Sequence, residues 1–140
     1  MPIDLSKKRV PPMGFIPLKE RDGTPMTQEN GDPCLARMHT PSSKIWQNAN
    51  ARRRRKALQR VREMGGRLEA GQETPEDIAE FLTEVTEEFI GVEVPLPEGE
   101  SGTKAMVKAI LSEPELGFIR DYLDDKSSDW GSFTFGSATS

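Results

Sequence analysis

The sequence contains one cysteine and one histidine, and both scarcities limit its chemistry. A lone Cys34 cannot form an internal disulfide or a thiolate zinc cluster. A lone His39 near Ser42 and Ser43 lacks the orienting group and oxyanion site that nucleophilic catalysis requires. We therefore expect Cys34 to be a small buried residue, His39 to be a polar residue at the end of a strand, and the protein not to be an enzyme.

Long apolar runs and ligand-binding loops are also missing. No stretch approaches the roughly 20 apolar residues of a membrane span, and residues 1–12 lack the apolar segment of a signal peptide. No GxxxxGK or GxGxxG loop occurs, and the carboxylates of residues 84–88 and 121–125 lack calcium-loop spacing. These absences predict a cytosolic protein with no metal, no cofactor and no membrane partner.

Charge is present but strongly segregated. Residues 42–67 hold nine Lys or Arg and one Glu, a net charge of +8, whereas residues 68–100 hold eleven Asp or Glu and no basic residue, a net charge of −11. Such adjacent blocks indicate two elements that attract each other, or two surfaces for different partners.

The N-terminal third predicts extended structure. Four prolines in residues 1–17 favour an arm, and Asp22-Gly23 and Asn30-Gly31 are turn signals. The alternating residues 34–39 could pair with residues 16–19 as a short β element that leans on helices. We therefore assign residues 1–41 to an arm with a small β element.

Four helices are expected in residues 42–126. A serine cap at Ser42 or Ser43 begins the first, which runs to a stop at Gly65-Gly66, and Thr74 with Pro75 begins the second. Two shorter helices follow, one after Ser101 and one after Pro114. Each of the first two helices has its apolar residues on one face. On the first helix these residues are Trp46, Ala49, Ala57, Val61 and Met64, and on the second they are Ile78, Phe81, Leu82, Val85 and Phe89. The prediction is a mainly α-helical single domain.

Residues 127–140 are too rich in Ser, Gly and Thr to form a core, which predicts a flexible tail. The aromatic residues Trp130, Phe133 and Phe135 interrupt it. They are candidate anchors for a partner, although Trp130 could instead fold back and cover the core.

The run Arg52, Arg53, Arg54, Arg55 and Lys56 is the other candidate partner site. Clustered guanidinium groups bind phosphates, so a nucleic-acid-binding regulator is one alternative function. The acidic pI of about 5.1 and the absence of a known nucleic-acid-binding signature weigh against it. The other alternative for the run is pairing with the acidic second helix or with an acidic protein.

Two motifs resemble the tail assembly chaperones of long-tailed bacteriophages. The first is the turn Asp22-Gly23-Thr24-Pro25, followed by a short strand region and a serine-capped basic helix from Lys44. The second is residues 111–120 (LSEPELGFIR), followed by acidic residues, Trp130 and Phe133. The chain departs from the family pattern at residues 88–91 (EFIG), where relatives often have Gly-Trp, and in its arginine run.

The resemblance implies a non-enzymatic protein of the infected bacterial host's cytoplasm that is absent from the finished virion. Its partners would be the tape measure protein and tail tube subunits, and a homo-oligomer is left open. Such families often make a longer frameshifted form, for which the Ser/Gly-rich tail would suit a linker. A structural neck or head-tail joining protein of the virion is the remaining alternative.

Overall fold

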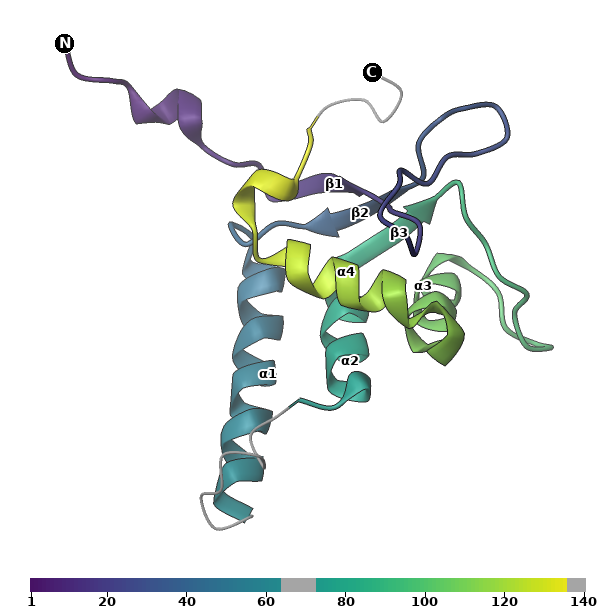
Figure 1. Ribbon diagram of the computed structural model, residues 1–140. Coiled ribbons are helices and arrows are strands. Elements are labelled where there is room, and N and C mark those ends of the chain that lie inside the picture. The colour runs from purple at the N-terminus through teal and green to yellow at the C-terminus, as the bar shows by residue number, and fades with distance from the viewer. Residues whose placement is uncertain (64–72, 136–140) are drawn as a thin grey trace.

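The computed structural model describes residues 1–63 and 73–135, and it contains a helical layer on one face of a three-stranded sheet (Figure 1). The sheet is antiparallel with the order β1-β2-β3. The strands are β1 (Met13–Pro17), β2 (Leu35–His39) and β3 (Thr86–Ile90). The α-helices are α1 (Lys44–Glu63), α2 (Pro75–Val85), α3 (Thr103–Ser112) and α4 (Gly117–Ser127). The described residues also form the short 3₁₀ helices η1 (Leu5–Lys8), η3 (Pro114–Leu116) and η4 (Trp130–Ser132).

The prediction of a mainly α-helical fold is wrong. Among the described residues, helical residues make up 49% and β residues 16%, so the fold is mixed α and β. The difference comes from β3, because the second helix stops at Val85 and Phe89 belongs to a strand. Phe89 pairs with Ala36 of β2, so a partner about fifty residues earlier in the chain overrides the helical spacing.

Both predicted turns are confirmed in the segment that joins β1 to β2. Gly23 and Gly31 have φ angles of 91° and 89°, which suit glycine. The carboxylate of Asp22 accepts a hydrogen bond from the Thr24 amide at 3.0 Å, and the Asn30 side chain accepts one from the Asp32 amide at 3.0 Å. These local bonds fix the two bends without tertiary contacts.

The predicted helix starts are also confirmed. Ser43 accepts a hydrogen bond from the Trp46 amide at 3.1 Å, and Thr74 with Asp77 forms a reciprocal capping box at the start of α2. Pro114 separates α3 from α4, as expected. The predicted stop at Gly65-Gly66, together with Met64, lies outside the described residues.

One hydrophobic core joins the sheet to the helices. Ile16, Ala36 and Met38 on the inner face of the sheet contribute to the same cluster as Phe81, Leu82 and Val85 of α2. Other members come from α3 and α4: Val107, Ile110, Leu111, Ile119 and Leu123. Residues 14–41 therefore contribute to the folded body, whereas residues 1–9 extend from it (Figure 1).

The described part of the predicted flexible tail packs on the body. Phe133 is 6% exposed and belongs to the core, while Thr134 exchanges two 2.8 Å backbone hydrogen bonds with Phe15 of β1. The Phe135 ring covers Gly14, where a Cβ atom would approach it to 2.7 Å. A flexible tail from residue 127 is thus wrong for residues 127–135, because Phe133 buries its ring and residue 134 covers the edge strand.

Replacing Phe81 with alanine tests the α2 core. Phe81 is almost fully buried and contacts Trp46 edge to face, with 5.8 Å between ring centroids. We expect Phe81→Ala to lower the free energy of unfolding by about 3 to 5 kcal/mol in urea titrations. The exposed Leu58→Ala serves as the control and should stay within about 0.5 kcal/mol of wild type. Equal effects of the two substitutions would contradict this packing.

Candidate functional site

The basic helix α1 and the acidic helix α2 lie side by side and are joined by ion pairs (Figure 1). Arg52 pairs with Glu84, Lys56 with Glu80, and Arg60 with Asp77. The basic residues are spaced by four, and their partners run in the opposite direction at spacings of four and three. This antiparallel ladder satisfies part of each charge block within the molecule.

Arg53 reaches a different set of acids at the end of this interface. Its guanidinium group pairs with Glu73 and, at 2.8 Å, with Asp124 of α4, and its side chain is only 18% exposed. It also lies 4.9 Å from the centroid of the Phe81 ring. Burial alone would lower the pKa of Arg53, but the hydrogen bonds and charges of Glu73 and Asp124 raise it. Arg53 therefore holds α1, α2 and α4 together.

The remaining two residues of the basic run point elsewhere. Arg54 and Arg55 are exposed and have no ion-pair partner among residues 1–63 and 73–135. Leu58, on the same helix, is 58% exposed. The five predicted site residues 52–56 are thus divided: three contribute to the helix interface and two remain on the surface.

The three aromatic residues predicted as partner anchors in the tail also differ in their exposure. Phe133 is a core residue, whereas Trp130 in η4 is 51% exposed and Phe135 lies half-exposed against β1. Trp130 therefore does not cover the core, and Phe133 takes that role. Trp130 and Phe135 remain available to a partner.

Cys34 and His39 have structural roles. Burial, and then the charge of Glu20, raise the pKa of the Cys34 thiol, so it stays protonated. The His39 ring nitrogen Nε2 lies 2.9 Å from a carboxylate oxygen of Glu87. Ser42 instead interacts with Thr40 and with backbone carbonyls. The expectations of a buried thiol and of a histidine at a strand end are confirmed.

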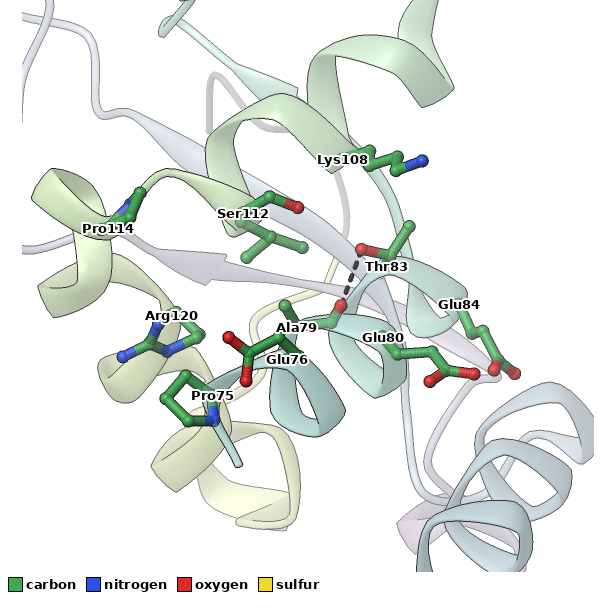
Figure 2. Close-up of a pocket in the computed structure, with 11 residues that line it drawn as sticks. Pro75, Glu76, Ala79, Glu80, Thr83, Glu84, Lys108, Ser112, Pro114 and Arg120 are labelled. Carbon is green, nitrogen blue, oxygen red and sulfur yellow. Dashed lines mark hydrogen bonds between the residues drawn. The ribbon is translucent and has the colours of Figure 1, made fainter. Parts of the chain in front are cut away.

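A surface groove of about 670 Å³ runs between α2 and the segment from α3 to α4 (Figure 2). One wall belongs to α2 and consists of Pro75, Glu76, Ala79, Glu80, Thr83 and Glu84. The opposite wall consists of Lys108, Leu111, Ser112, Pro114 and Arg120. The groove has the size of sites that take a few side chains of a ligand or peptide.

The chemistry of the groove is apolar at the base and charged at the rims. Ala79 and Leu111 are buried beneath it, and the Thr83 hydroxyl donates to the Ala79 carbonyl at 2.7 Å, as Figure 2 shows. Acidic side chains stand on the α2 rim, and Lys108 and Arg120 stand on the other. This arrangement suits non-covalent binding of a short amphipathic segment.

This groove was not predicted from the sequence. Ala79 and Thr83 are small residues four positions apart, next to the apolar arc of α2. Small side chains at that spacing leave a furrow when a second helix packs alongside. The sequence does not reveal that α3 would be that second helix.

Within the described parts of the chain, no group of three or more His, Cys, Asp or Glu side chains could hold a metal ion. None of the described helices is both long enough and apolar enough to cross a membrane. Comparison of the chain with protein-family models, curated proteins and solved structures finds no significant match.

Substitution of neighbouring arginines tests the division of the basic run. Arg53→Met should lower the free energy of unfolding by about 1 to 3 kcal/mol, because it leaves two half-buried carboxylates without their cation. Arg54→Met is the matched control and should change stability by less than about 0.5 kcal/mol. Equal losses in urea unfolding would show that Arg53 does not join the helices.

Acid titration tests the ladder at Asp77. Burial opposes ionisation of this carboxyl, but hydrogen bonds from Arg60 and Thr74 outweigh it and lower its pKa. The stability that this shift supplies is present above the unfolded pKa of about 3.9 and is lost as the pH falls through the lower folded pKa. Asp77→Asn should therefore cost roughly 1 to 2 kcal/mol at neutral pH and progressively less below about pH 4. If urea unfolding showed the same stability difference between Asp77→Asn and wild type at every pH in this range, the pairing of Asp77 with Arg60 would be contradicted.

Proposed function

We propose that this protein is a non-enzymatic tail assembly chaperone of a long-tailed bacteriophage, acting in the cytoplasm of the infected host. Its client would be the tape measure protein, to which it would also recruit tail tube subunits. The observation that carries the proposal is the open apolar groove between α2 and α3, together with the two motifs that resemble this chaperone family.

The groove favours protein binding over catalysis. Its rims carry Glu76, Lys108 and Arg120 around a small-residue base, and it contains no cysteine, histidine or tyrosine. The hydroxyl of Thr83 is already bonded within α2. A site of this kind suits recognition of the shape and charge of a ligand.

The ladder between α1 and α2 weakens the nucleic-acid alternative. Arg52, Arg53 and Lys56 each pair with an acid of the same chain, so phosphate would have to compete with these partners. Within the run, Arg54 and Arg55 are the residues that have no ion-pair partner among the described residues. Two phosphate contacts would contribute only weakly to affinity through counterion release. Protein binding is therefore the better-supported function.

The size of the groove also suggests how a long client would be held. A groove that takes only a few side chains provides modest affinity for any one segment. A client with many similar segments would bind several copies of the chaperone along its length. Each copy would cover apolar side chains that would otherwise promote aggregation of the client.

Filling the groove tests the proposal. Ser112 is exposed at the end of α3, so Ser112→Trp should occupy the groove without disturbing the core. We expect Ser112→Trp to weaken capture of the co-expressed tape measure protein at least about tenfold, or roughly 1.4 kcal/mol, in pull-down titrations. The matched control is Ser101→Trp, an exposed serine outside the groove that should retain capture.

Unchanged capture by Ser112→Trp would reject the groove as the client site. Failure of the wild-type chain to capture the tape measure protein at all would reject the chaperone function. Mass spectrometry of purified virions then decides between the chaperone and a neck or head-tail joining protein, since only a virion component would persist in the particle.

A further inference from the structure

The N-terminal arm, residues 1–9, extends from the body as an exposed segment. It is anchored just after its end, where Thr40 and Ser42 hydroxyls donate to the carbonyls of Pro11 and Val10 at 2.6 and 3.1 Å. Every residue of the arm is exposed. In Figure 1 the arm leaves the body on the β1 side, away from α3.

The arm is not an ordinary polar extension. Its apolar side chains Met1, Ile3 and Leu5 are all strongly exposed, with Ile3 at 73% and Leu5 at 71%. Three cations follow at residues 7–9. The carboxylate of Asp4 accepts hydrogen bonds from the Ser6 amide at 3.0 Å and hydroxyl at 2.7 Å, so the arm has local order. Ordered, exposed apolar side chains mark a binding segment, since partial order lowers the entropic cost of docking.

The arm and the groove match in size and in charge. A groove of about 670 Å³ accommodates a few apolar side chains, and the arm offers three. On the α2 rim, Glu76 has no ion-pair partner among the described residues and would face the cations of residues 7–9, whereas Glu80 and Glu84 already pair with Lys56 and Arg52 of α1. On the opposite rim, Lys108 would face Asp4, whereas Arg120 pairs with its neighbour Asp121. Opposite charges on both rims favour one orientation of the arm.

We infer that the N-terminal arm of one copy binds in the α2–α3 groove of a second copy. Each molecule then donates an arm and accepts another, which is a head-to-tail contact unless two molecules exchange arms reciprocally. The inference shares the groove with the proposed function, and the arm therefore competes with the client. Self-association through the arm protects the groove until the client displaces it.

Sedimentation velocity of the full chain tests this inference. The wild-type chain should self-associate at concentrations up to roughly 100 μM. Ile3→Asp combined with Leu5→Asp should weaken self-association at least about tenfold, because it places charges where apolar side chains dock. Ser112→Trp should weaken it from the groove side. Ile45→Asp combined with Leu58→Asp is the matched control, since it changes two exposed apolar side chains of α1 outside the arm.

The outcomes separate the two proposals. Loss of self-association in both the arm and groove variants, with the α1 control unchanged, supports the arm-in-groove contact. A monomeric wild-type chain, or an arm variant that associates like wild type, overturns it and leaves client capture untouched. If the arm variant loses self-association and binds the client more tightly than wild type, the arm competes for the groove as inferred. Unchanged or weaker client binding by the arm variant would overturn that competition.

Discussion

The burial of α2 is the constraint on which the rest of the structure depends. One side of this helix places Phe81, Leu82 and Val85 against the sheet, α3 and α4, while its acidic side meets the basic residues of α1. Its furrow at Ala79 and Thr83 forms a wall of the groove. Core, ladder and groove are thus three faces of one eleven-residue helix, and a rotation of α2 would disturb all of them.

The segregation of charge along the chain has a structural and a functional consequence. Opposite blocks fold against each other, so most of the positive charge of residues 52–56 is matched within the molecule. Surface ion pairs of this kind contribute little stability individually, but Arg53, enclosed by two acids and an aromatic ring, fixes the position of α1. On the outer side of α1, Arg54, Arg55 and Leu58 are exposed.

Local sequence signals predicted the elements that are determined locally. The turns at Asp22 and Asn30, the caps at Ser43 and Thr74, and the apolar arc from Ile78 to Val85 depend on neighbours in sequence, and the structure confirms them. Strand β3 and the docking of Phe133 depend on partners far along the chain. Phe89 fits the helical arc of α2 in sequence, and its pairing with Ala36 of β2 decides its state. The groove was missed for the same reason.

The pairing of Phe15 with Thr134 has a consequence for how the chain is made. These residues are separated by 119 positions, so a ribosome adding about 5 to 20 residues per second needs roughly 6 to 24 seconds between them. Until residue 134 has been made, the outer edge of β1 cannot pair with it, and Phe133 cannot take its place in the core. An open strand edge is the kind of surface that pairs with other chains. Closure of the edge by residue 134 is a late event in biogenesis.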